Sequence, residues 1–286
     1  MKLVANMETQ TEALATADFE KLRSLILDEC GISLGREKKT MLEIRLKRRL
    51  RSLNLSSYTQ YCGYLFAHET RKQELVHLID VVTTNKTDFF REPDHFGYLV
   101  EKALPVLNRE NGTARRCEIW SAGCSTGEEP YTLAMLLSEY AQSCPGFRFH
   151  ILATDVSTTV LDKARLAVFR SNGIAPIPPE MRRKYLMRGR EPGSDLVRVV
   201  PELRAHIEFR RLNFMDRDYG LSGLREIIFC RNVIIYFDRA TQIRILRKLL
   251  AHLSPGGYFF SGHSESLQNM DLPLVAVGAA VYRKCG

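Results

Sequence analysis

Residues 121–131, with the sequence SAGCSTGEEPY, place two glycines, two glutamates and a proline in one short turn. The four residues before it, 117–120 (CEIW), are typical of a short buried strand, and apolar residues recur at helical spacing over 131–137. The stretch therefore predicts a turn that joins a strand to a helix. Thr126 can cap that helix, and Pro130 lies near its first position, where a missing N–H is tolerated.

Beyond this turn the chain alternates between helical and strand-like patterns. Helices are predicted at 129–142, 157–168 and 239–253, and strands at 148–153, 226–230 and 258–261. The alternation favours an α/β domain with a mainly parallel sheet, and the strand-like ending at 275–283 can return antiparallel at an edge. Residues 187–199 interrupt it as a hairpin with a Gly/Pro turn, and 206–210 can add a third strand. We therefore expect a small antiparallel β insertion at about 180–213.

The N-terminal part of the chain is helical in pattern. Phe19, Leu22, Leu25 and Ile26 form one apolar stripe, and Leu42, Leu46, Leu50 and Leu53 form a second. Gly31 can end the first helix as a left-handed residue. These patterns lead us to expect four regions. They are a flexible tail (1–16), an all-helical domain (17–82), a linker that contributes to the functional site (83–92) and the α/β domain (93–286).

Composition limits the class of protein. The 286-residue chain contains no run of about 18 apolar residues, and its first residues have no apolar signal region. We therefore expect a cytoplasmic protein without membrane insertion, and we expect it to be a monomer. Its seven cysteines are scattered and form no CxxC pair or Cys/His cluster, so no metal is expected.

Positive charge is concentrated in one segment. The formal net charge is +8, and residues 36–51 contain eight Lys or Arg and two Glu. On a helix, Arg45, Arg48 and Arg49 share one face and the leucine stripe takes another, so burial of the leucines leaves the arginines outward. The segment predicts an anionic partner, which need not be a nucleic acid.

The turn and the strand that follows it suggest a ligand. Ligands of open α/β sheets lie beyond the carboxyl ends of the strands, where Gly123 and Gly127 let a ligand approach the backbone. Asp155 ends the next strand and can accept hydrogen bonds from ribose hydroxyls. The turn lacks the Lys-Ser/Thr of a P-loop, and Glu128 and Glu129 would repel a pyrophosphate. S-adenosylmethionine (AdoMet), a positively charged nucleoside without phosphates, fits better.

Structural roles are the alternative for these acidic residues. Glu128 and Glu129 at a helix N-terminus are favoured by the helix dipole alone, by about 0.3–1 kcal/mol. Asp155 can simply cap the following helix. On these residues alone, both interpretations stay open.

Four motifs together resemble one family, the CheR chemotaxis-receptor glutamate methyltransferases. They are TNKTDFFRE (84–92), STGEEPY (125–131), FCRNVIIYFD (229–238) and GHSE (262–265). The resemblance covers nearly the whole chain. It implies a seven-stranded, Rossmann-like AdoMet domain whose last strand is antiparallel. It also implies AdoMet as methyl donor, glutamate side chains on the cytoplasmic helices of chemoreceptors as acceptors, and S-adenosylhomocysteine and glutamate methyl esters as products.

The resemblance also implies how receptors are bound. In some members the β insertion grips a short peptide at the receptor's C-terminus. The helices that carry the acceptor glutamates are acidic, so we expect Arg45, Arg48 and Arg49 to dock the receptor.

Site residues follow from the same motifs. Cofactor contacts fall on Asn85, Thr87, Arg91, Glu129, Asp155, Asn213, Phe214, Arg231 and Asn232, beside Gly123 and Gly127 of the turn. Arg91 and Tyr236 are expected to hold the acceptor carboxylate, which is already the nucleophile at pH 7 because its pKa is about 4.3. Arg91 can instead pair with Glu92 or Asp88. Tyr236 can instead belong to the core, and His263 is interpreted as a structural loop residue.

Two other functions compete with receptor methylation. The basic segment prompts an AdoMet-dependent nucleic-acid methyltransferase. However, residues 231–234 (RNVI) stand where amino-directed enzymes of that class usually carry an Asn/Asp-Pro-Pro-aromatic motif, so we expect no nucleic-acid partner. The second competitor is a non-catalytic AdoMet-sensing adaptor, and the presence of Arg91, Asp155 and Tyr236 argues against it.

Overall fold

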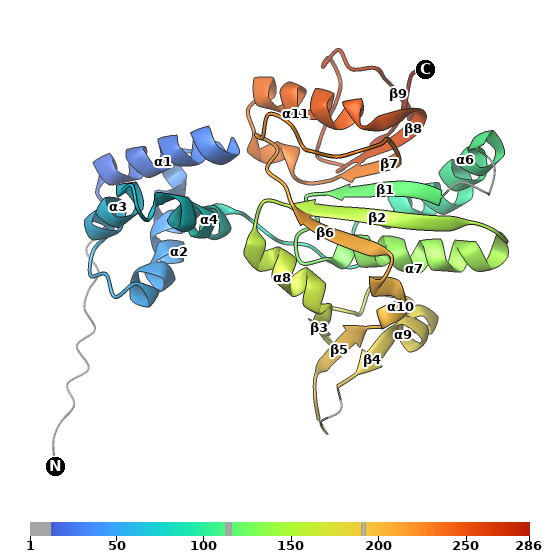
Figure 1. Ribbon diagram of the computed structural model, residues 1–286, viewed down its shortest axis with the longest axis horizontal. Coiled ribbons are helices and arrows are strands. Elements are labelled where there is room, and N and C mark those ends of the chain that lie inside the picture. Colours follow the sequence, from blue (N-terminus) through green and yellow to red (C-terminus); the bar gives the residue numbers. More distant parts are fainter. Residues whose placement is uncertain (1–12, 112–115, 190, 192) are drawn as a thin grey trace. The chain divides into compact units, whose positions relative to one another are not determined.

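The computed structural model describes residues 13–111, 116–189, 191 and 193–286. It divides the chain into two compact units, one up to Thr84 and one from Asn85 onward (Figure 1). Within the described ranges no helix is both long and apolar enough to cross a bilayer. Of the predicted tail, 1–16, residues 1–12 lie outside the described residues. Leu14 is buried and the first helix starts at Thr16, so the helical unit begins earlier than predicted.

The first unit is all-helical, as predicted. Its helices are α1 (Thr16–Cys30), α2 (Lys39–Ser52), α3 (Tyr58–Phe66) and α4 (Arg71–Val82), with a 3-10 turn, η1 (Arg36–Lys38), before α2. Both apolar stripes form its core, although Leu53 is only partly buried. Gly31 ends α1 with a φ of 73°, and its N–H donates to the carbonyl of Leu27, as expected for a left-handed C-cap.

The second unit is built on a seven-stranded sheet with the order β6-β2-β1-β7-β8-β10-β9. The strands are β1 (Arg116–Ala122), β2 (Arg148–Asp155), β6 (Ile207–Arg211), β7 (Arg225–Cys230), β8 (Leu253–Ser261), β9 (Leu274–Gly278) and β10 (Val281–Lys284). β10 runs antiparallel to β8 and β9, and the other neighbouring pairs are parallel. The mainly parallel sheet with an antiparallel last strand is confirmed. The single strand predicted at 275–283 is in fact the pair β9 and β10.

Helices cover both faces of this sheet. They are α5 (Pro93–Tyr98), the π-helix η2 (Leu99–Ala103), α6 (Leu104–Asn111), α7 (Glu128–Ser143), α8 (Thr158–Leu166), α11 (Arg239–Ala251) and the 3-10 turn η3 (Ile234–Tyr236). Figure 1 shows α7 and α8 on one side of the sheet and α11 on the other. Ile119 of β1 packs in the core that contains α7, and its neighbour Trp120 packs in the core that contains α11. Because both faces are covered, a central strand such as β7 is buried along its whole length.

A second, smaller sheet corrects one prediction. It consists of β3 (Val168–Arg170), β5 (Leu196–Val199) and β4 (Leu186–Arg188) in that order, all antiparallel, with the short helices α9 (Pro179–Tyr185) and α10 (Pro201–Arg204) beside it in sequence. The predicted hairpin is therefore confirmed as β4 and β5. Its third strand is β3, whereas the predicted 206–210 strand is β6, which pairs parallel with β2. Parallel pairing needs a long crossover, and α8 with the whole insertion supplies it.

Candidate active site

The turn after β1 depends on two glycines in the left-handed region. Gly123 and Gly127 have φ values of +90° and +101°. A Cβ at Gly123 would lie 2.5 Å from Cγ2 of Val233, and one at Gly127 would lie 3.1 Å from the side chain of Ala164. These glycines therefore let the turn pack against the chain that follows β7 and against α8. Their proposed contact with a ligand stays a prediction.

The start of α7 differs from the prediction. Gly127 is the N-cap residue and makes no side-chain cap, so the predicted cap by Thr126 is wrong. The Thr126 hydroxyl instead donates to Oε2 of Glu128, at 2.6 Å. Gly127 takes the cap position because its φ of +101° strongly disfavours a residue with a Cβ.

Asp155 ties the first two strand ends together. Its Oδ2 accepts the N–H of Ser125 at 2.9 Å, and its Oδ1 accepts the N–H of Ser157 at 3.0 Å. The side chain of Ser157 accepts from the N–H of Val160 and is the N-cap of α8, so Asp155 is not that cap. Asp155 is only partly buried, at the tip of β2, where it links the glycine turn to the start of α8.

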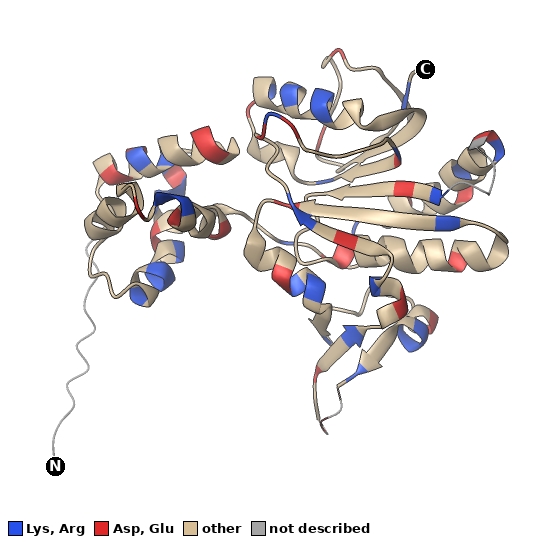
Figure 2. Cartoon of the chain, viewed as in Figure 1, with Lys and Arg blue, Asp and Glu red and all other residues tan. Residues whose placement is uncertain are grey.

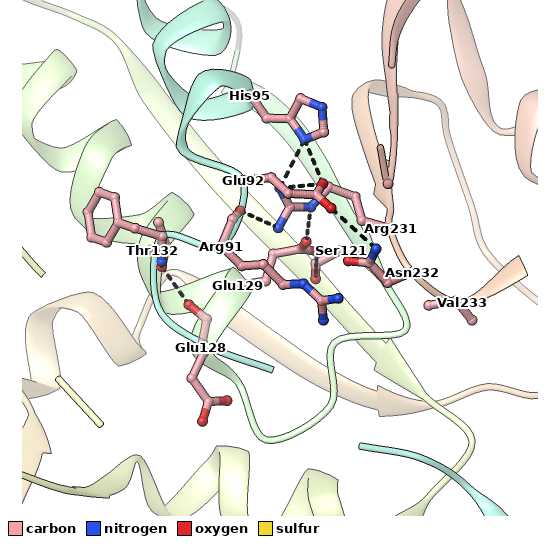
Figure 3. Close-up of polar contacts among 12 residues, drawn as sticks. Arg91, Glu92, His95, Ser121, Glu128, Glu129, Thr132, Arg231, Asn232 and Val233 are labelled. Atoms are coloured by element: carbon pink, nitrogen blue, oxygen red, sulfur yellow. Dashed lines mark hydrogen bonds and ion pairs between the residues drawn. The ribbon is translucent and has the colours of Figure 1, made fainter. Parts of the chain in front are cut away.

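The two adjacent glutamates of the turn point in different directions (Figure 3). Glu129 accepts from the Ser121 hydroxyl at 2.7 Å and from Nε of Arg231 at 2.8 Å. Glu128 lies away from this pair, and burial raises the pKa of its carboxyl group. The charge of Glu129 is thus already matched within the protein. The acidic turn is therefore less available to a cationic ligand than its sequence suggests.

Arg231, directly after β7, is the centre of a buried polar cluster. Its side chain is 3% exposed, and the guanidinium lies 5.1 Å from the ring centre of Phe96. Besides Glu129, it donates from Nη2 to the carbonyl of Arg91 at 2.8 Å and contacts Nδ1 of His95 at 3.0 Å (Figure 3). One guanidinium therefore joins α7, α5 and the segment that precedes α5.

The protonation states of the cluster follow from burial and from Arg231. Burial and the nearby guanidinium lower the pKa of His95 to about 4, so the ring is neutral and its Nδ1 accepts from Arg231. Burial opposes ionisation of Glu92, but the charge of Arg231 and the hydrogen bonds from Asn232 and from the N–H of His263 together outweigh it and lower the pKa of that carboxyl group. Possible ligand atoms of Glu92, His95 and His263 lie within 4.8 Å of one another. Because Arg231 already supplies the positive charge there, we interpret these residues as a hydrogen-bonded cluster.

The segment before α5 lines the same edge of the sheet. Phe89 is buried in the core, and the N–H of Phe90 donates to the hydroxyl of Thr132. The carbonyl of Asn85 accepts from the Ser125 hydroxyl at 2.9 Å, and Thr87 lies between these anchors. Arg91 donates from Nη1 to the carbonyl of Lys86 at 3.0 Å.

The alternative partners of Arg91 are not used. Among the described residues it forms no ion pair with Asp88 or Glu92. Its guanidinium instead folds back over its own segment.

The remaining predicted residues lie beyond β6 and β7. Asn213 accepts the N–H of Met215 through Oδ1, and Phe214 is buried against the α11 side. Asn232 has a φ of +59° and donates from Nδ2 to Oε1 of Glu92. Tyr236 ends η3 and is only partly buried, outside the packed core clusters.

The topology brings the predicted site residues of the second unit together. β6, β2, β1 and β7 are adjacent and parallel, so their carboxyl ends share one edge of the sheet. Asp155 ends β2, and Asn213, the glycine turn and Arg231 follow β6, β1 and β7.

Comparison with known proteins agrees with this arrangement. The second unit matches the family model described as CheR methyltransferase, SAM binding domain, over residues 85–282. The first unit matches the CheR methyltransferase all-alpha domain over residues 17–83. The chain is 40% identical to the chemotaxis protein methyltransferase of Salmonella typhimurium, across 96% of this chain and 92% of that protein. The chain belongs to the CheR methyltransferase family.

A second relative shows the same extent of similarity. The chain is 40% identical to chemotaxis protein methyltransferase 2 of Pseudomonas aeruginosa, across 93% of this chain and 92% of that protein. As a CheR family member, the chain is an AdoMet-dependent methyltransferase, and its second unit is the AdoMet-binding domain.

The basic helix of this CheR family member corrects a further prediction. Arg45 is not free on the surface, because its Nη1 donates to the carbonyls of the last turn of α4 and the next residue, Val81, Val82 and Thr83, at 3.0–3.1 Å. Helices leave their last carbonyls without partners inside the helix, and Nη1 of Arg45 supplies donors to those at the end of α4.

Arg49 is also occupied within the helical unit. It forms a 2.6 Å ion pair with Glu74, which is 1% exposed and also accepts from the hydroxyl of Tyr61. Of the three predicted docking residues, Arg48 alone is exposed, and the other two are partly buried. The outward face of α2 consists of Ile44, Lys47, Arg48 and Arg51, which we call the α2 face. Figure 2 shows the concentration of basic residues along α2.

Several residues that the structure brings to this edge of the sheet have no role predicted from sequence. Ser121 and His95 carry no pattern that distinguishes them from strand and helix residues. Glu92 and Glu265 lie inside the quoted motifs, and membership of a motif was the signal that could have identified them. Several of their partners, such as Asn232 for both glutamates, lie more than 30 positions away, which no local pattern reveals.

Proposed function

We propose that this protein transfers the methyl group of AdoMet to glutamate side chains of chemoreceptors, giving glutamate methyl esters and S-adenosylhomocysteine. Support comes from the relatives, which are named chemotaxis protein methyltransferases. One contact carries the proposal: Arg231, which follows β7, donates to the carbonyl of Arg91 and so joins the 85–92 segment to the strand ends. This arrangement supports a role for Arg91 at the edge of the sheet where we propose that the cofactor binds. Incubation with tritiated AdoMet and receptor fragments tests it, and the expected product is base-labile label on glutamate.

The residues present fit AdoMet. Asp155 would accept the ribose hydroxyls, since a carboxylate at the tip of the second strand is the usual partner of a ribose. Asn213 and Phe214 would line the neighbouring part of the site, beyond β6. When bound, AdoMet supplies an electrophilic methyl group next to a sulfonium charge.

The protein's part in the reaction is to orient and to exclude water. The acceptor carboxylate is ionised at pH 7, so no side chain has to remove a proton. We propose that Arg91 and the hydroxyl of Tyr236 hold it in line with the methyl group. Reaction neutralises two opposite charges, so a site that excludes water favours the transition state.

Replacing Tyr236 with phenylalanine is expected to lower kcat by about 2- to 12-fold, which corresponds to one neutral hydrogen bond. Affinity for S-adenosylhomocysteine should stay at the wild-type value, because the hydroxyl is assigned to the acceptor. Single-turnover methyl transfer and calorimetry measure the two quantities separately. Tyr140→Phe is a matched control, since that hydroxyl contacts Asn108. Unchanged turnover in Tyr236→Phe would remove the hydroxyl from the mechanism.

We propose that the α2 face docks the acidic receptor helix. Arg48→Ala with Arg51→Ala is expected to raise KM for receptor by about 2- to 5-fold, in the range of exposed ion pairs. The salt dependence of methylation should become weaker, because screening acts on exposed charges. Lys21→Ala with Lys72→Ala removes the same charge from α1 and α4 and should leave KM unchanged. Equal KM values for the two double variants would exclude this docking surface.

The small sheet is the proposed site for a C-terminal receptor peptide. In the part of the chain that the structure describes, its outer strands, β3 and β4, each have one edge without a partner strand in that sheet. An extended peptide can add to such an edge through main-chain hydrogen bonds.

A further inference from the structure

Glu265, in the loop after β8, is a buried carboxylate surrounded by backbone donors. It is 4% exposed. Oε1 accepts the N–H of Val233 at 2.7 Å and that of Ile234 at 2.9 Å, and Oε2 accepts the N–H of Asn232 at 2.8 Å and that of Gly262 at 2.6 Å. Three of the four donors, residues 232–234, are consecutive and begin two positions after the end of β7.

Consecutive N–H groups that converge on one point form an anion-binding nest. Here the anion belongs to the protein itself. Each carboxylate oxygen accepts two N–H groups, so both oxygens have to be acceptors. A glutamine amide at this position would turn an NH₂ group toward two N–H donors. Burial raises the pKa of Glu265, and the four N–H groups oppose that rise by favouring its ionised form.

The loop that Glu265 holds carries groups from both sides of the proposed reaction. Asn232 has a left-handed φ of +59° and lies next to Arg231 at the proposed cofactor edge. Tyr236, at the end of the same loop, is assigned to the acceptor. The fit of the loop is close, because a Cβ at Gly262 would lie 2.5 Å from Nδ2 of Asn232.

We propose that Glu265 is a positioning residue for methyl transfer, which fixes the loop of residues 232–236 so that Asn232 faces the cofactor and Tyr236 faces the acceptor. It forms no covalent bond and transfers no proton. Its kinetic consequence rests on the proposed function, whereas its effect on cofactor binding does not.

Glu265→Gln tests the proposal, with Glu226→Gln as the matched control. Glu226 is a second buried glutamate, at the amino end of β7, and accepts the N–H of Glu118 at 2.8 Å. Trp120 is the single tryptophan of the chain, so its fluorescence reports whether the second unit is folded in each variant. We expect folded Glu265→Gln to have a kcat about 10- to 150-fold below wild type, which corresponds to the loss of a hydrogen bond to a charged group. Affinity for S-adenosylhomocysteine should fall by about tenfold.

A coupling measurement separates positioning from general destabilisation. In the Glu265→Gln background, Tyr236→Phe should lower kcat little further, because the loop no longer holds the hydroxyl in position. In the Glu226→Gln background, Tyr236→Phe should lower kcat as much as it does in the wild type. If Glu265→Gln does not fold, Glu265→Ala with added acetate replaces it. Acetate can occupy the four N–H groups and should restore affinity for S-adenosylhomocysteine, whereas acetamide should not.

Two results would overturn the proposal. One is a folded Glu265→Gln protein with wild-type kcat and wild-type S-adenosylhomocysteine affinity. The other is the full effect of Tyr236→Phe in the Glu265→Gln background. A wild-type protein that binds S-adenosylhomocysteine but methylates no receptor would instead contradict the proposed function, and the binding and acetate measurements would still decide the role of Glu265.

Discussion

Arg231→Met is expected to lower the free energy of unfolding of the second unit by about 3–5 kcal/mol, the usual effect of removing one partner from a buried ion pair. The remaining carboxylate of Glu129, 11% exposed, would keep only the Ser121 hydroxyl of its two partners. The carbonyl of Arg91 would lose its donor at the same time. Affinity for S-adenosylhomocysteine should fall with it, because Arg231 fixes the 85–92 segment against the strand ends.

Denaturant unfolding followed by Trp120 fluorescence measures this loss. Arg225→Met is the matched control, because Arg225 is also buried at β7 but donates to the backbone carbonyls of Ser222 and Leu224. Its removal leaves no carboxylate without a partner, so a smaller loss is expected. Arg231→Met combined with Glu129→Gln should recover part of the stability, since Glu129 then carries no unpaired charge, while Glu92 still lacks the guanidinium 3.7 Å from its Oε2. If Arg231→Met lowers the free energy of unfolding by less than about 1 kcal/mol, the ion pair of Arg231 and Glu129 behaves like a solvent-exposed one, and its buried position in the structure is contradicted.

Asp155→Ala is expected to weaken binding of AdoMet and S-adenosylhomocysteine by the same factor, about 10- to 150-fold, because both carry the same ribose. The structure adds a second cause, since Asp155 also accepts the N–H groups of Ser125 and Ser157. Asp155→Asn keeps one acceptor oxygen and should show a smaller loss than Asp155→Ala.

Calorimetry with both ligands measures the loss of affinity. Asp162→Ala, which removes an exposed carboxylate of α8 paired with Arg165, is the control and should bind as wild type does. Wild-type affinity in a folded Asp155→Ala protein would remove Asp155 from the cofactor site.

The core of the fold could be predicted from sequence because local patterns encode it. The 121–131 turn, the apolar runs of β1 and β7 and the Gly31 cap each depend on residues close in sequence. The third strand of the insertion was misassigned for the opposite reason. β6 is short, and its residues are mostly exposed or partly buried. It belongs to the large sheet only because it pairs with β2, which lies more than 50 residues earlier in the chain.

The docking face shows the same limit at the level of side chains. Helical periodicity places Leu42, Leu46 and Leu50 inward, but Arg45 and Arg49 lie at the border of that stripe. Their direction is decided by the carbonyls at the end of α4 and by the buried Glu74. Neither partner can be recognised from α2 alone.

The contacts of Arg45 also determine how the two units are joined. Arg45 fixes the carbonyl of Thr83 to α2, and the Ser125 hydroxyl fixes the carbonyl of Asn85 to the glycine turn. The peptide groups on either side of Thr84 are thus each held by a different unit. Any rotation of one unit against the other has to pass through the few backbone torsions around Thr84 and Asn85.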